Sequence, residues 1–195
     1  MKEGHRKTVS IVGDADIEEE GPRFAHAYGC GRRLIAEGYR LVTGGRGGVM
    51  EAACRGAREA EAWCDGDIVG ILPGRDPSRA NPYVDIPIAT GLQMARNLVV
   101  ANSEAVIAVG GGAGTLSEIA FAWQLNRPIV ALEIPGWSGE LGGLRLDDRD
   151  RSNGLGDEDQ VWPASDPEEA VALVGRLIED HATRPESFHD SPDSG

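Results

Sequence analysis

Short, continuously apolar runs alternate with amphipathic segments along most of the chain. Runs such as "VSIV", "AVIAV" and "PIVAL" lack a polar–apolar alternation, which is typical of strands covered on both faces of a sheet. The predicted strands are Thr8–Val12, Tyr39–Thr43, Asp67–Leu72, Ala105–Val109 and Pro128–Glu133, with shorter ones at Val84–Ile88 and Gln160–Trp162. Apolar residues at helical spacing predict helices at Glu18–Glu37, Val49–Ala62, Leu92–Asn102 and Thr115–Gln124, and a last helix capped at Asp166.

This alternation of strands and helices predicts a single α/β domain of the Rossmann-like kind. Its sheet is expected to be doubly wound and mostly parallel, with helices on both faces. We expect the domain to span residues 1–182, with a long surface excursion at Ile134–Asp159, which is rich in glycine and aspartate. Residues 183–195 have the polar, acidic composition of a disordered tail.

Composition narrows the range of partners. The 195 residues carry a formal net charge of −13, which disfavours nucleic acid and anionic membranes, because both are bound through excess Lys and Arg. No apolar run approaches the roughly 20 residues of a membrane span, and the charged N-terminus lacks an apolar signal core. We therefore expect a cytoplasmic protein. Cysteines without a CxxC spacing favour reduced thiols, and scattered histidines argue against a metal site.

Two dense glycine clusters follow predicted strands. The stretch "GGGAGT", from Gly110 to Thr115, lies between a strand and a helix, and Gly44–Gly48 follows the strand that ends at Thr43. In a parallel sheet, ligands bind at the carboxyl ends of the strands where the strand order reverses. Glycines let the backbone approach an anion closely, and a helix N-terminus offers unpaired N–H groups. The first cluster therefore predicts a phosphate-binding loop.

Glu118, three residues beyond Thr115, has two interpretations. The stretch "TLSE" matches a capping box, in which the Glu118 side chain only returns to the Thr115 amide. Alternatively, Glu118 faces the group that the phosphate carries. Two glycine loops at strand ends are more than tight turns require, which favours a ligand.

An arginine upstream adds to the ligand hypothesis. Arg96, in the stretch "GLQMARN", is as a lone residue most often a solvated helix position. Its helix, however, leads directly into the strand Ala105–Val109, so its first turn is expected to border the same crevice. An arginine there pairs with a phosphate or polarises a leaving base.

These three elements together resemble one family. The stretches "VTGGRGGVMEAACRGA", "GLQMARN" and "GGGAGTLSEIAFAWQL" are similar to the Rossmann-type nucleotide-binding proteins often labelled "possible lysine decarboxylase". The best understood members are the Lonely Guy cytokinin-activating phosphoribohydrolases. The resemblance covers about Thr8–Gly143 and implies a doubly wound sheet and at least a homodimer. The decarboxylase label is considered a misnomer, and nothing in the sequence supplies a lysine for pyridoxal phosphate.

The resemblance also implies roles for single residues. Glu118 and Arg96 match the family's catalytic glutamate and arginine. The residues expected to bind phosphate or nucleotide are Gly110, Gly111, Gly112, Gly114 and Thr115 in the first loop, Gly44, Gly45, Gly47 and Gly48 in the second, and Gly13, Asp14, Met94 and Asn97.

The chain departs from the family at three of these positions. Gly110 stands where proline is usual, Asn97 follows Arg96 where lysine is usual, and Asp14 follows Gly13 where serine is common. A buried carboxylate repels a nearby phosphate, so Asp14 must point away, contact ribose hydroxyls or meet a cation. These departures are closer to a branch that also resembles molybdenum-cofactor carrier proteins.

Two functions follow as expectations. The leading hypothesis is hydrolysis of the N-glycosidic bond of a nucleoside 5′-monophosphate, which releases free base and ribose 5-phosphate. Glu118 would stabilise an oxocarbenium-like transition state or orient the water, and Arg96 would assist departure of the base. The alternative is a non-catalytic carrier or sensor of a nucleotide or of a phosphorylated pterin such as the molybdenum cofactor. The hydrolysis requires no metal and no redox cofactor.

Self-association is a further expectation. Apolar residues occupy more than one side of the short helix Thr115–Gln124, whereas one stripe suffices for packing on its own sheet. These residues are Leu116, Ile119, Phe121 and Trp123. The sequence therefore predicts a homodimer or homotetramer, and a purely structural oligomer without a ligand is the third, least favoured function.

Overall fold

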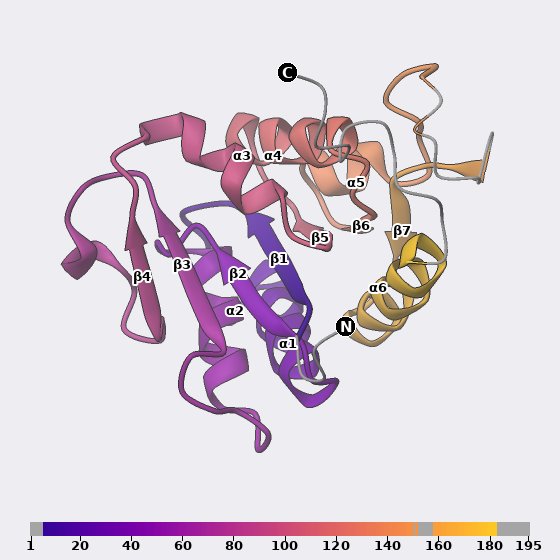
Figure 1. Ribbon diagram of the computed structural model, residues 1–195. Coiled ribbons are helices and arrows are strands. Elements are labelled where there is room, and N and C mark those ends of the chain that lie inside the picture. Colours follow the sequence, from indigo (N-terminus) through magenta and orange to yellow (C-terminus); the bar gives the residue numbers. More distant parts are fainter. Residues whose placement is uncertain (1–5, 150, 152–157, 183–195) are drawn as a thin grey trace.

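The computed structural model describes residues 6–149, 151 and 158–182. These residues form one parallel sheet of seven strands in the order β4-β3-β2-β1-β5-β6-β7, with helices on both faces (Figure 1). The strands are β1 (Thr8–Gly13), β2 (Arg40–Thr43), β3 (Ile68–Leu72), β4 (Ile86–Ala89), β5 (Ala105–Val109), β6 (Ile129–Leu132) and β7 (Trp162–Ala164). The predicted single α/β domain with a doubly wound sheet is confirmed.

The helices divide into two layers. They are α1 (Pro22–Ala36), α2 (Val49–Arg58), α3 (Arg96–Ala101), α4 (Ala113–Gln124), α5 (Trp137–Leu141) and α6 (Pro167–Ala182), with 3-10 turns η1 (Pro77–Arg79) and η2 (Gln93–Ala95). One apolar core joins α1, α2 and α6 to the sheet, and a second core joins α3 and α4 to the opposite face. Helices α1 and α2 cross closely at Gly31, where a Cβ would overlap the carbonyl of Ala53. The lack of a side chain at Gly31 thus allows this close packing.

The strand order reverses between β1 and β5. Strand β1 pairs with β2 on one side and with β5 on the other, and all these pairs are parallel. The chain leaves β1 for α1 on one face of the sheet and leaves β5 for α4 on the other face (Figure 1). The carboxyl ends of β1 and β5 therefore border the crevice in which such sheets bind ligands.

Several element bounds differ from the predictions. The helix predicted from Glu18 begins at Pro22, because Glu20 has a φ of 67° and the chain turns there before proline takes the first helical position. The helix predicted over Leu92–Asn102 is the 3-10 turn η2 followed by α3, and α2 ends at Arg58 instead of Ala62.

The carboxyl-terminal third also holds two corrections. The predicted surface excursion Ile134–Asp159 contains the helix α5, and the last predicted strand is shifted by two residues to β7. The predicted tail, residues 183–195, lies outside the described residues. Within the described residues, no helix combines the length and the apolar character that crossing a bilayer requires.

Candidate functional site

The first glycine loop carries the chain from β5 into α4. Gly110 and Gly111 have φ angles of 62° and 99°, and Gly112 is the N-cap of α4, which begins at Ala113. The first N–H groups of a helix have no carbonyl acceptor one turn earlier in that helix. A Cβ at Gly112 or at Gly114 would meet no heavy atom within 4 Å, so this helix N-terminus faces open space. An anion fits such a terminus.

The capping-box interpretation of Thr115 and Glu118 is wrong. Helix α4 begins two residues before Thr115, and its N-cap Gly112 has no side-chain capping bond. The glycine loop lets the chain enter the helical conformation before the local "TLSE" pattern would start it. Thr115 is therefore an interior residue of the first turn, and Glu118 lies one turn further along the same helix.

Glu118 pairs with Arg96 of α3. Nη1 of Arg96 lies 3.5 Å from Oε1 of Glu118, and the two side chains are only 12% and 8% exposed. Nη1 of Arg96 is buried without a hydrogen-bond partner among the described residues. The guanidinium lies over the Cα of Gly44, where a Cβ would overlap it. The absence of a side chain at Gly44 thus makes room for Arg96.

Burial shifts the pKa of both partners toward their neutral forms. Loss of solvation raises the pKa of Glu118 to about 7, against the opposing effect of the Arg96 charge. Burial likewise lowers the pKa of Arg96, which the Glu118 carboxylate counteracts. The pair therefore offers a guanidinium with an unused N–H group beside a carboxyl group that exchanges its proton near neutral pH.

A cavity of about 330 Å³ joins this pair to the N-terminus of α4. Ten of the predicted site residues line it: Gly13, Asp14, Gly44, Met94, Arg96, Asn97, Gly112, Gly114, Thr115 and Glu118. Four further residues line the cavity that were not predicted: Ile11, Val12, Ala15 and Met50. Their positions in the sequence could have identified them. Ile11, Val12 and Ala15 lie within two residues of Gly13, and Met50 lies two residues after Gly48.

The other predicted glycines lie outside the lining of this cavity. These are Gly45, Gly47, Gly48, Gly110 and Gly111. Their visible roles are in packing: a Cβ at Gly48 would overlap the carbonyl of Asp14, and the N–H of Gly110 donates to Oγ of Ser138 over 2.8 Å. Contact of these glycines with a nucleotide stays a prediction.

Asp14 meets a cation, one of the three arrangements expected for it. Its Oδ2 accepts a hydrogen bond from the N–H of Gly111 at 2.9 Å and lies 3.3 Å from Nε of Arg23. Asp14 also lines the cavity, with its side chain 25% exposed. One donor of the glycine loop is therefore already bound to a carboxylate of the chain itself.

Asn97 braces the two helices that carry Arg96 and Glu118. Its Nδ2 donates to Oγ of Ser117 over 2.8 Å, and this hydroxyl donates in turn to the carbonyl of Gly114. Asn97 is buried, and these two partly buried bonds fix α3 against the first turn of α4.

Comparisons with known proteins agree with this architecture. A model of the SLOG cluster4 family matches residues 6–171. A protein of Archaeoglobus fulgidus, described as uncharacterized, is 41% identical over 129 residues, which cover 65% of this chain and 80% of that protein.

Two solved structures of cofactor-binding proteins are similar over nearly their whole length. The molybdenum cofactor binding protein of the phototrophic bacterium Rippkaea orientalis is 36% identical, with a TM-score of 0.71, over 89% of this chain and 98% of that chain. The molybdenum cofactor carrier protein of Chlamydomonas reinhardtii is 32% identical, with a TM-score of 0.68, over 90% and 99% of the two chains.

Proposed function

The chain belongs to the SLOG cluster4 family, and from that premise we propose that it is a carrier of a phosphorylated, nucleotide-like pterin, with the molybdenum cofactor as cargo. The observation that carries the proposal is the cavity at the switch point of the sheet, which joins an open helix N-terminus to the Arg96–Glu118 pair. The pterin is suggested by the two relatives that bind or carry the molybdenum cofactor.

The N-terminus of α4 is suited to the phosphate of such a ligand. Its free N–H groups and the helix dipole favour a negative charge, and the Thr115 hydroxyl adds a donor at the same place. Open space at Gly112 and Gly114 leaves room for the phosphate oxygens. Phosphate bound there places the rest of the ligand in the cavity.

The deep end of the cavity is suited to a ring with both donors and acceptors. The guanidinium of Arg96 lines the cavity and is a donor for a ring carbonyl or nitrogen. Glu118, whose pKa burial raises to about 7, accepts a ring N–H when ionised and donates when protonated. Reversible polar contacts of this kind hold a cargo without changing it, which is what a carrier needs.

Binding of the cofactor tests this function. The molybdenum cofactor released from a purified molybdoenzyme is mixed with the protein, and the pterin and molybdenum that co-elute in gel filtration are measured. Gly114→Asp adds a charge against the phosphate, and its Cβ meets open space. An acidic residue in the first turn also suits the helix dipole, so the fold is retained.

We expect the wild type to retain the cofactor, and we expect the amount that Gly114→Asp retains to be at least about tenfold smaller. Gly74→Asp is the matched control, because Gly74 also faces open space and lies outside the cavity. No retention by the wild type would contradict the carrier function, and equal retention by Gly114→Asp would contradict the phosphate site at the N-terminus of α4.

A second candidate function, hydrolysis as in the Lonely Guy phosphoribohydrolases, is favoured by the Arg96–Glu118 pair. In this reaction the oxygen of water bonds to C1′ of the ribose, the N-glycosidic bond breaks, and the base leaves with a proton. Glu118 would stabilise the cationic ribose, and Arg96 would hold the departing base.

Chromatography of nucleoside monophosphates incubated with the protein tests this candidate. If the chain is a hydrolase, the wild type releases free base and ribose 5-phosphate in equal amounts, and Glu118→Gln loses about 100-fold in turnover, or about 3 kcal/mol of transition-state stabilisation. Nucleotide binding by Glu118→Gln is expected to persist. If the wild type releases no base, hydrolysis is excluded and the carrier is the remaining candidate function.

We also propose that the chain forms a homodimer or homotetramer. The support is a group of large apolar side chains that the chain leaves exposed between residues 86 and 99.

A further inference from the structure

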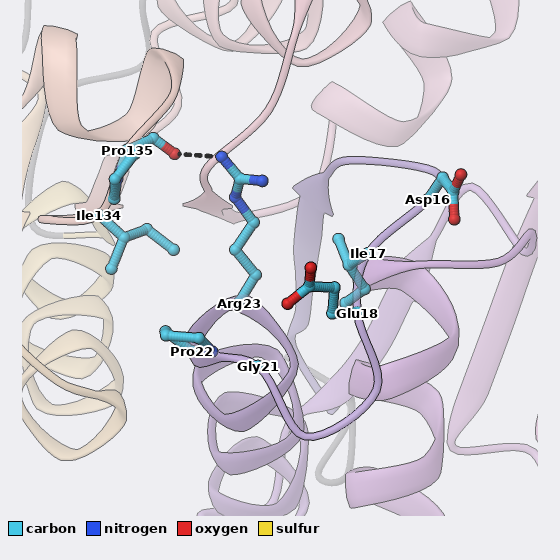
Figure 2. A pocket seen from close by; sticks show the side chains of 8 residues that line it. All are labelled: Asp16, Ile17, Glu18, Gly21, Pro22, Arg23, Ile134 and Pro135. Carbon is cyan, nitrogen blue, oxygen red and sulfur yellow. Dashed lines mark hydrogen bonds between the residues drawn. The ribbon is translucent and has the colours of Figure 1, made fainter.

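A second, larger cavity lies on the α1 side of the crevice. Its volume is about 530 Å³, and its lining comes from the β1–α1 connection, the first turn of α1 and the segment after β6. The lining residues are Asp16, Ile17, Glu18, Gly21, Pro22, Arg23, Ile134 and Pro135. Figure 2 shows Arg23 rising from α1 between Ile134 and Pro135 on one side and Ile17 and Glu18 on the other.

One ion pair separates the two cavities. Arg23 lines the larger cavity, and Asp14, its partner at 3.3 Å, lines the smaller one. Nη2 of Arg23 donates to the carbonyl of Pro135 over 2.9 Å (Figure 2). A Cβ at Gly110 would lie 2.8 Å from Nε of Arg23 and 3.0 Å from Oδ2 of Asp14, so the pair lies directly over this glycine.

The position of the Asp14 carboxylate is a built site for an anionic oxygen. Oδ2 is held by a backbone N–H, that of Gly111, and by the guanidinium of Arg23. A phosphoryl oxygen accepts from the same two kinds of donor. The Asp14 side chain is 25% exposed, so it can turn outward when a stronger anion arrives.

We propose that the larger cavity holds the second half of a ligand whose two halves are joined by a diphosphate. The phosphoryl group next to the one at α4 replaces the Asp14 carboxylate between Gly111 and Arg23. This inference rests on the proposed function, because the first half occupies the smaller cavity. Doubly wound sheets bind the two halves of a dinucleotide on either side of their switch point in the same manner.

The lining of the larger cavity indicates that the second half is a nucleoside. Ile17, Pro22, Ile134 and Pro135 are apolar walls for a flat ring. Asp16 and Glu18 repel a terminal phosphate, whereas carboxylates accept hydrogen bonds from ribose hydroxyls. The negative charge of the larger cavity therefore disfavours a ligand that carries a further phosphate beyond the diphosphate.

Calorimetry with three guanine nucleotides tests the inference. The probes are GMP, GDP and a compound in which two guanosines are joined through their 5′ positions by a diphosphate. Guanine is chosen because its 2-amino-6-oxo edge presents the same donors and acceptor as the 2-amino-4-oxo edge of a pterin. We expect the two-guanosine compound to bind about tenfold tighter or more than GMP and GDP. GDP separates the effect of the second phosphate from that of the second nucleoside.

Variants of the larger cavity then show whether the higher affinity for the two-guanosine compound arises there. Arg23→Gln and Ile17→Trp are expected to abolish the tenfold advantage, which is taken as the ratio of the two-guanosine affinity to the GMP affinity within each variant. The matched control is Arg32→Gln, an exposed arginine on the same helix that lines neither cavity, and it is expected to keep the advantage. Arg23→Gln decides the test if Ile17→Trp fails to fold.

Equal affinities for GMP and the two-guanosine compound, or an advantage that survives in Arg23→Gln, overturn the inference. In both outcomes GMP still binds, so the proposed function stands. If GMP binding is unaffected by Gly114→Asp, the proposed site in the smaller cavity fails instead. If none of the three probes binds, the inference fails, and the retention of the molybdenum cofactor alone decides the proposed function.

Discussion

Gly44 and Arg96 show at the level of single residues how a missing side chain shapes the site. The sequence predicted Gly44 as part of a glycine loop beside a nucleotide. In the structure its φ is not positive, and its small size instead admits the Arg96 guanidinium, which a Cβ would overlap. The same Cβ would come within 2.6 Å of Sδ of Met50. Both atoms are at the ends of flexible side chains that line the cavity, so a Cβ at Gly44 would push the guanidinium out of its place beside Glu118.

Gly44→Ala is therefore expected to displace Arg96 and to weaken both stability and binding. Overpacking of this kind costs about 1–3 kcal/mol of unfolding free energy. Denaturant unfolding and cofactor retention measure the two effects. Gly74→Ala is the control, since its Cβ meets nothing within 4 Å. Identical behaviour of the two variants would show that Arg96 does not depend on Gly44.

Glu118 predicts a pH dependence of stability. Its pKa is raised from 4.5 to about 7 in the folded protein, so the folded state keeps this proton to higher pH than the unfolded chain does. The free energy of unfolding therefore falls as pH rises through this range, and it levels off above about pH 7. Glu118→Gln stays neutral and lacks this loss. Relative to the wild type, the variant should gain up to about 3 kcal/mol between pH 4 and pH 8.

Urea unfolding of both proteins at several pH values measures this gain. Below about pH 7, Glu118 is largely protonated in the wild type as well, so the charge beside Arg96 differs between the two proteins mainly above this pH. The change of the stability difference with pH is therefore the informative quantity. Glu61→Gln, at an exposed position, is the control. A stability difference that does not change with pH would rule out a raised pKa for Glu118.

At the level of elements, the sequence predicts the strands better than the ends of the helices. Strands β1, β2, β3, β5 and β6 are buried on both faces, so their apolar runs are continuous and easily recognised. Helix starts depend on neighbours far along the chain. The "TLSE" pattern suggested a start at Thr115, but the glycine loop allows α4 to begin at Ala113.

Helix α5 could not be predicted because distant contacts hold it in place. The N–H groups of Trp137 and Ser138 donate to the carbonyls of Gly111 and Gly110. Oγ of Ser138 accepts from the N–H of Gly110 and donates to the carbonyl of Leu132. A local stretch of glycine and polar residues gives no sign of these bonds. Helix α5 therefore fixes the shape of the phosphate loop from outside the cavity.

Ser138→Ala should loosen this loop. Ser138 is fully buried, so the variant leaves a buried N–H and a buried carbonyl with fewer partners. Such groups cost about 1–3 kcal/mol. We expect lower stability and weaker cofactor retention, measured by thermal unfolding and gel filtration. Ser165→Ala, at an exposed serine, is the comparison. If Ser138→Ala retains the cofactor as fully as the wild type does, α5 does not contribute to the binding site.

At the level of the whole molecule, topology explains why much of the candidate site was predictable. Parallel strands bring their carboxyl ends to one edge, so Gly13, Gly44 and Gly112 meet although they are far apart in sequence. The Asp14–Arg23 pair and the larger cavity were not predictable. They depend on the path of the β1–α1 connection and on its approach to Pro135, 112 residues after Arg23. No local pattern records that approach.

The expected self-association remains a prediction, but a different set of apolar residues supports it in the structure. Of the four apolar residues of α4 on which it rested, Ile119 and Trp123 are buried within the chain, whereas Leu116 and Phe121 are half-buried. The exposed large apolar side chains of the described residues gather instead between residues 86 and 99. They are Ile86, Ile88, Leu92, Met94, Leu98 and Val99, and only Trp137 and Leu144 lie elsewhere.

This apolar stretch includes the edge strand β4, the turn η2 and the helix α3, which begins at Arg96 (Figure 1). Met94 is 67% exposed and also lines the smaller cavity, so a partner on this face would cover the cavity's rim. An unpaired strand edge with apolar side chains favours pairing with a second copy. The net charge of −13 opposes association, so the measurement needs physiological salt to screen it.

We expect light scattering at physiological salt to give at least twice the chain mass of 20.7 kDa for the wild type. The double variant Leu98→Glu, Val99→Glu places charges on the apolar face and should shift the protein to the monomer, because an unpaired charge is costly in an interface. Leu144→Glu changes an equally exposed leucine outside this stretch and should keep the oligomer. A monomeric wild type would refute self-association, and an oligomer that persists in the double variant would place the interface on another face.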